Sequence, residues 1–116
     1  MDFLTVQGAL LAKARVASTF RSRLVGLLAH RTLAPAEGLL LIPGGSIHTI
    51  GMRFAIDVIF VDAQLVVLKV ATAVRPCRHV NAPRGTWGAL ELRAGRALEH
   101  DVVHGARLIA RAIVAR

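Results

Sequence analysis

Residues 44–62 read GGSIHTIGMRFAIDVIFVD, and they set polar residues inside a stretch that is otherwise apolar. Four of them carry side chains that can bind or react: His48, Thr49, Arg53 and Asp57. Burying such groups costs free energy unless each one finds a hydrogen-bond partner. The stretch is therefore the first place to look for a site, and we expect the rest of the chain to support it.

Apolar patterns on both sides of this stretch predict a protein made mainly of strands. Residues 56–61 and 65–70, joined by Asp62-Ala63-Gln64, are typical of a β-hairpin. Alternation or short apolar runs predict further strands over residues 9–17, 38–42, 87–92 and 107–114. Two segments between them have other patterns: residues 75–85 predict a long surface loop, and residues 94–101 predict one or two helical turns.

One segment has the periodicity of an amphipathic helix. Phe20, Leu24, Leu27 and Leu28 follow the spacing of one helical face, which predicts a main helix over about residues 18–29. Gly26 lies inside it, where a missing side chain would let another element pack closely. Because most connections between strands are too short for parallel crossovers, we expect an α+β fold: a mostly antiparallel small β-barrel or curled sheet, with the helix over one opening.

Length and composition predict a single folded domain, residues 1–116, with one core. With 54% hydrophobic and 19% charged residues, disorder is excluded as the main state. Cys77 is the only cysteine, which excludes an internal disulfide and a cysteine-rich zinc site. The N-terminus lacks a signal-peptide pattern, and no apolar segment reaches the ~20 residues of a membrane helix. These features predict a cytoplasmic protein with no membrane partner.

The net charge of +8 raises the question of nucleic-acid binding. The 13 arginines, however, are scattered from Arg15 to Arg116, and few aromatic residues lie beside them to stack on bases. Scattered solvated charge is therefore the preferred interpretation, and nonspecific nucleic-acid binding is the weakest functional hypothesis.

Asp57 is the most informative single position. In a strand its side chain shares a face with Ile59 and Val61, and the opposite face is apolar too. The carboxylate is either a site acid or base, or a structural acceptor for backbone amides; we favour the second because buried polar groups are usually satisfied structurally. His48 is a candidate base, ligand or core histidine. Nine residues of extended chain span ~30 Å, so His48 meets Asp57 only if the chain turns back, with Gly51 as the pivot.

The other polar positions have competing interpretations. Thr49 is more typical of a hydroxyl bonded locally to the backbone than of a nucleophile. Arg53 either holds an anion or pairs with a surface acid, and Met52 is expected to fill the core. Glu91, between two leucines in a predicted strand, is expected to face solvent or to cap a basic patch.

Cys77 precedes Arg78 and His79, and cationic neighbours can activate a thiolate. Neighbours in sequence need not be neighbours in space, so the inert interpretation is preferred. No phosphate-cradling glycine motif is present, and we expect neither a metal nor a cofactor.

Several separated motifs resemble one family. The run at residues 46–62, SIHTIGMRFAIDVIFVD, is similar to the central signature of the uncharacterised bacterial and archaeal family called domain of unknown function 192. Arg23 with residues 26–28, the glycine-led run 38–41, and residues 89–92 followed by Ala94-Gly95 agree with it. This chain has His48-Thr49 where many members have a tryptophan-methionine-lysine-asparagine-threonine run, and Leu28 where they have methionine. The resemblance implies a mostly antiparallel β fold with a helix, and it supplies no activity, cofactor or partner.

Two functional hypotheses follow. The first is a non-enzymatic binding or accessory domain that holds a small anionic or polar ligand, or a partner protein. Its contacts would be His48, Thr49, Arg53 and Asp57, with Met52, Glu91 and Gly26 as structural support. The alternative is a small hydrolase or lyase with His48 and Asp57 in acid–base roles. That alternative requires both side chains to converge on one open pocket.

Overall fold

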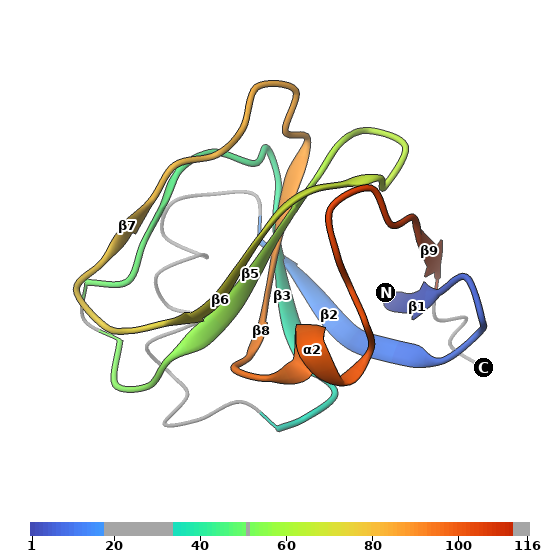
Figure 1. Ribbon diagram of the computed structural model, residues 1–116, viewed down its shortest axis with the longest axis horizontal. Helices are drawn as coiled ribbons and strands as arrows, with labels where there is room; N and C mark the ends of the chain where they lie inside the picture. The colour runs from blue at the N-terminus through green and yellow to red at the C-terminus, as the bar shows by residue number, and fades with distance from the viewer. Residues whose placement is uncertain (18–33, 51, 113–116) are drawn as a thin grey trace.

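The computed structural model of the chain describes residues 1–17, 34–50 and 52–112. In this part of the chain, seven strands form one curled sheet and two short strands form another (Figure 1). The strands of the larger sheet are β1 (Asp2–Thr5), β2 (Leu10–Ala17), β3 (Glu37–Leu41), β5 (Ile56–Val61), β6 (Val67–Val74), β8 (Gly88–Arg93) and β9 (Leu108–Arg111). The smaller sheet pairs β4 (Ile47–His48) with β7 (His79–Val80), and α2 (Arg96–Glu99) is a single helical turn. The main helix expected over about residues 18–29, with Gly26, lies outside the described residues.

The larger sheet has the order β6-β5-β8-β3-β2-β1-β9. All of its neighbouring strands are antiparallel except β2 and β3, which run parallel. The two ends of the sheet approach each other through a bridge between Val66 and Arg107. Backbone bonds from Val67 N to Ala106 O (2.7 Å) and from Leu108 N to Leu65 O (2.9 Å) hold this junction. The sheet is therefore curled into a partial barrel.

The hairpin of β5 and β6 is stabilised by its connection. Asp62 Oδ1 accepts hydrogen bonds from Gln64 N and Val66 N, both at 2.9 Å. This is the local bonding by which aspartate favours turns. The predicted hairpin is confirmed, although β6 begins at Val67 and continues to Val74.

The two faces of β5 are both covered, each by a different hydrophobic cluster. Ile59 and Val61 belong to the cluster inside the curl, together with residues of β1, β2, β8, α2 and β9. Ile56, Val58 and Phe60 belong to a second cluster on the other face. All six residues of β5 are buried as a result, and β5 lies in the centre of the core.

A separate layer covers the second face, and we call it the β4–β7 lobe: the described residues of 43–55 and 75–87. Ile47, Met52 and Phe54 from its first segment pack onto the sheet, as do Val80 and Ala82 from its second. In Figure 1 β7 lies to the left of β5 and β6, and the segment from β7 to β8 passes above them, while β1 and β9 lie at the right. Gly44 makes the close approach at its base: a Cβ there would come within 2.8 Å of the Gly88 backbone.

The strands predicted over residues 9–17, 38–42, 56–61 and 87–92 are confirmed as β2, β3, β5 and β8, and the turn within 94–101 is confirmed as α2. The strand expected over 107–114 is β9, as far as the structure describes it. Sequence patterns missed β1 and β4, and they predicted a loop over the segment that contains β7. The sheet is mostly antiparallel, as expected; β2 and β3 form a parallel pair, and residues 18–36 between them are long enough for a crossover.

Candidate functional site

Asp57 is an anchor inside the sheet. Its side chain is fully buried. Oδ1 accepts a hydrogen bond from Ala73 N at 2.9 Å, and Oδ2 accepts from Gly95 N at 3.1 Å and Ala97 N at 3.0 Å. Three backbone amides therefore satisfy the carboxylate, as the structural interpretation of this residue expected.

The amides that Asp57 binds belong to two irregular parts of the backbone. Ala73 has φ +48°, beside an irregularity in the β5–β6 register, and Gly95 has φ +95° where α2 begins. Such regions leave N–H groups without ladder partners, so a carboxylate is needed to satisfy them. Asp57 thus joins the end of β6 to the start of α2.

Arg96 ties the α2 turn to strand β2. Its Nε donates to Leu11 O and its Nη2 donates to Leu10 O, both at 2.9 Å. A planar guanidinium can reach two adjacent carbonyl oxygens in this way. Arg96 and Asp57 therefore fix α2 from two sides.

Thr49 has the corresponding role in the β4–β7 lobe. It is fully buried, and its Oγ1 donates to Arg75 O at 2.6 Å and accepts from Arg78 N at 2.8 Å. Its backbone adds bonds from Thr49 N to Arg78 O (2.8 Å) and from Cys77 N to Thr49 O (3.0 Å). Side chain and backbone together thus tie the 75–78 turn, in which Cys77 has φ +60°, to the end of β4. Thr49 thus bonds to the backbone, as expected, but its partners lie in a distant segment and are not the local groups that were expected.

His48 and Arg53 are exposed, in contrast to Thr49 and Asp57. His48 lies on β4 directly opposite His79 of β7. Arg53 follows Met52, whose backbone N–H donates to Thr49 O at 3.2 Å. Of the four candidate contact residues, these two are the ones that a ligand in solution can reach.

The structure does not bring His48 and Asp57 together. The Asp57 side chain lies on the face of β5 that carries Ile59 and Val61, whereas the β4–β7 lobe with His48 covers the face that carries Val58 and Phe60. The sheet itself separates them. Both Asp57 oxygens are also occupied, so the pair forms no acid–base dyad in this arrangement.

Two supporting residues are buried. Met52 is 8% exposed and fills the cluster beneath the lobe, which confirms its expected packing role. Glu91 is fully buried, so the expectation that it faces solvent is wrong. It lies opposite Leu39 and Val58 in a central strand, where both faces of the sheet are covered.

The charge of the lobe is of one sign. No aspartate or glutamate occurs in residues 38–56 or 63–90. The exposed arginines and histidines of the lobe are His48, Arg53, Arg75, Arg78, His79 and Arg84. Lys69 of β6 joins them at the edge, since its Nζ donates to Asn81 O at 3.0 Å. Of these residues, the sequence pattern singled out only His48 and Arg53 as ligand contacts. The lack of aspartate and glutamate in residues 38–56 and 63–90 was the signal that could have identified the other cationic positions.

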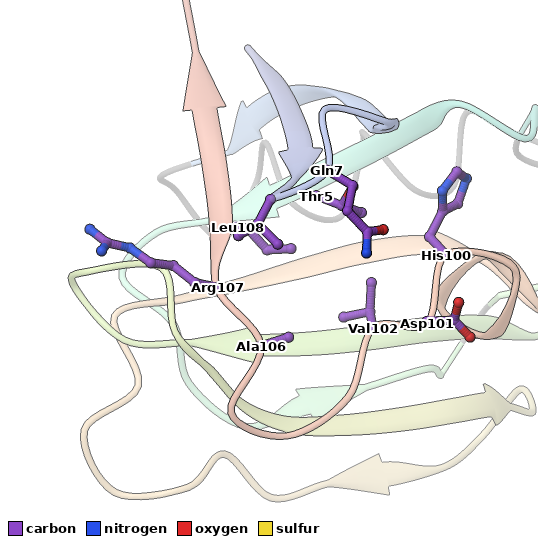
Figure 2. Close-up of a pocket in the computed structure, with 9 residues that line it drawn as sticks. Thr5, Gln7, His100, Asp101, Val102, Ala106, Arg107 and Leu108 are labelled. Atoms are coloured by element: carbon purple, nitrogen blue, oxygen red, sulfur yellow. The ribbon is translucent and has the colours of Figure 1, made fainter.

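A different region contains a small hollow (Figure 2), outside the lobe. It has a volume of about 150 Å³ and is lined by residues of β1, β9 and the turns beside them, including Thr5, Gln7 and Val102. Figure 2 shows the Arg107 side chain pointing away from it. Ligand pockets usually measure about 300–1,000 Å³. This hollow is smaller than that, and it is not the candidate site.

The described residues contain neither a cluster of metal ligands nor a membrane-spanning helix. No group of three or more His, Cys, Asp or Glu side chains in residues 1–17, 34–50 and 52–112 is arranged to hold a metal ion. In the same part of the chain, no helix has the length and apolar character needed to cross a membrane.

Comparisons with known proteins agree with this architecture. Residues 3–110 match the model of the family described as "Uncharacterized ACR", domain of unknown function 192. A crystal structure of a "putative transcription regulator" from Sinorhizobium meliloti 1021 is similar, with 22% identity, a TM-score of 0.79, and coverage of 93% of this chain and 89% of that one. A protein of unknown function from Novosphingobium aromaticivorans DSM 12444 has 20% identity and a TM-score of 0.80, with 94% and 82% covered. At these identities the likeness concerns the fold alone. No curated protein gives a significant match.

Proposed function

The chain belongs to the DUF192 family, and from that premise we propose that it is a non-enzymatic binding or accessory module whose β4–β7 lobe holds a small anionic or polar ligand, or a partner protein. One observation carries the proposal: the exposed ionisable groups of the lobe are arginines and histidines, apart from the Cys77 thiol, and residues 38–56 and 63–90 contain no carboxylate side chain. A surface of one sign attracts ligands of the other sign and raises their local concentration.

The candidate residues divide into two roles under this proposal. His48 and Arg53 contact the ligand, because their side chains are exposed. Thr49 and Asp57 position the surface, because their polar atoms bind backbone groups. Buried Met52 and Glu91 support the sheet beneath.

Two further features of the proposal come from the sequence. We place the protein in the cytoplasm, the location that the sequence pattern predicts. We also assign it to the α+β class, which depends on the helix expected over about residues 18–29.

A thermal-shift screen tests the proposal, since a ligand that binds only the native state raises its apparent stability. The screen compares anionic, neutral and cationic small molecules at constant ionic strength. It uses the wild type, Arg53→Gln with Arg78→Gln as the lobe variant, and Arg107→Gln as a matched control. Arg107 is an exposed arginine outside the lobe.

The expected result is a set of stabilising compounds that are mainly anionic, whose effect falls in the lobe variant and persists in Arg107→Gln. Compounds that stabilise all three proteins equally would place the binding surface elsewhere and reject the proposal. If the screen finds no ligand at all, a partner protein is the remaining form of the proposal, and the same two variants serve in a binding assay.

The competing hypotheses have less support. An acid–base enzyme built on His48 and Asp57 would need a free Asp57 oxygen, and both oxygens accept backbone hydrogen bonds. Nucleic acid is a larger anion that a cationic surface can attract. If it were the partner, its affinity would fall steeply as salt is raised.

A further inference from the structure

The pair of histidines on the β4–β7 ribbon has a defined geometry. His48 and His79 are cross-strand partners, and the backbone bond from Thr49 N to Arg78 O lies at the next pair along the ribbon. The histidines therefore occupy a non-hydrogen-bonded position, where opposite Cβ atoms are about 4.5–5.5 Å apart and both side chains point to the same face. Both are exposed, while Ile47 and Val80 on the other face pack onto the sheet.

The backbone beneath the pair is held in place. The Thr49 hydroxyl and backbone bind the carbonyl of Arg75 and the amides of Cys77 and Arg78. These bonds keep β7 in register with β4. The two imidazoles are therefore presented by a fixed scaffold, which limits the ordering cost of binding a ligand between them.

The surroundings of the pair decide what it can hold. The ionisable groups on the neighbouring segments are Arg53, Lys69, Arg75, Cys77 and Arg78. Two imidazoles at this spacing could chelate a divalent metal, but the four cationic residues on these segments and the lack of a carboxylate in residues 38–56 and 63–90 disfavour a cation. When both histidines are protonated, two like charges face each other across the ribbon, which is unfavourable unless an anion lies between them.

We propose that His48 and His79 together form the recognition site for a doubly charged tetrahedral oxyanion, such as the phosphate group of a small molecule, for which inorganic sulfate is a mimic. The inference rests on the proposed function and names its ligand class. A protonated imidazole attracts an anion more strongly than a neutral one, so we expect binding to strengthen as the pH is lowered from about 8 to about 5.

The test uses inorganic sulfate, which keeps its double charge across this range, with sodium chloride exchanged to hold ionic strength constant. Binding is followed by NMR through the imidazole and backbone amide shifts of His48 and His79. The proteins are the wild type, His48→Gln, His79→Gln and the double variant. His104→Gln is the matched control, because His104 is exposed and lies outside the lobe.

We expect wild type and His104→Gln to bind sulfate on the order of tenfold more tightly at about pH 5.5 than at about pH 8, which corresponds to about 1.4 kcal/mol. Each single variant should lose part of this gain, and the double variant should lose all of it. Near-normal unfolding curves for the variants would exclude a folding defect, since both side chains are exposed.

Three outcomes would overturn the inference. The first is that sulfate binding depends on pH as strongly in the double variant as in the wild type. The lobe could then still bind a ligand, but the two histidines would not take part. The second is that sulfate changes the NMR shifts of His48 and His79 at neither pH. That result would reject the oxyanion site alone, because the proposed function is tested separately by the thermal-shift screen. The third is Ni²⁺ binding that is lost in His48→Gln while sulfate has no effect, which would make the pair a metal site.

Discussion

The Asp57 carboxylate accepts a hydrogen bond from the Ala97 backbone amide at 3.0 Å, although 40 residues separate the two in the chain. This bond and those to Gly95 and Ala73 join β5 to the start of α2 and the end of β6. The residue that looks most like a catalytic acid in the sequence is thus a structural acceptor.

Replacing Asp57 with Asn should therefore destabilise the fold strongly. The asparagine NH2 group would face at least one backbone N–H, so two donors would meet and a hydrogen bond would be lost, together with the charge. We therefore expect a loss of roughly 3 kcal/mol in the free energy of unfolding. Urea denaturation measures it. Asp101→Asn is the matched control, because Asp101 is exposed and its φ of +53° suits asparagine. Equal effects of the two substitutions would contradict the anchoring role.

Replacing Thr49 with Val keeps the side-chain shape and removes the hydroxyl. Arg78 N and Arg75 O then lose their shared partner, and we expect a cost of about 2 kcal/mol. Amide hydrogen exchange should show faster exchange at Arg78, whose N–H binds the hydroxyl. Thr49→Ser retains the hydroxyl and should exchange like wild type; if Val and Ser behave alike, the hydroxyl does not hold the turn.

Two adjacent glycines provide a matched test of close packing beneath the lobe. A Cβ on Gly44 would come within 2.8 Å of the Gly88 backbone, whereas a Cβ on Gly45 has no atom within 4 Å. Gly44→Ala should therefore cost about 1–3 kcal/mol by overpacking, and Gly45→Ala should be close to neutral. Thermal unfolding measures both effects. If Gly45→Ala is destabilised as much as Gly44→Ala, the turn tolerates no side chain at either position, and close packing at Gly44 is not the cause.

Replacing Arg96 with Lys retains the charge but loses the two-pronged contact with the carbonyls of Leu10 and Leu11. We expect a loss of about 1–2 kcal/mol in the free energy of unfolding, because a single ammonium cannot reproduce both bonds in the same geometry. Urea denaturation measures this loss, and Arg93→Lys, at an exposed position at the end of β8, controls for the exchange of side-chain type. If Arg96→Lys is as stable as the wild type, a positive charge at this position is sufficient to hold α2 against β2, and the two-pronged contact is not required.

The sequence by itself determined the strands whose apolar residues alternate or run together, because side-chain direction has a period of two along any strand. It placed β5, β8 and the Asp62 turn, and it identified the face of β5 on which Asp57 lies. It could not determine what covers each face of the sheet, because that depends on segments far along the chain. Glu91 was misassigned for this reason: its leucine neighbours fit an edge strand as well as a central one.

Tertiary structure alone decided the composition of the candidate site in residues 44–62. The pattern grouped His48, Thr49, Arg53 and Asp57, but the sheet separates His48 from Asp57, and the pairing of β4 with β7 brings His79 opposite His48. Two-residue strands carry too little periodicity to be predicted, since they are held by hydrogen bonds to a distant partner and by packing onto an existing sheet. Local pattern thus determined which residues are polar within a buried stretch, and long-range pairing decided which of them reach solvent.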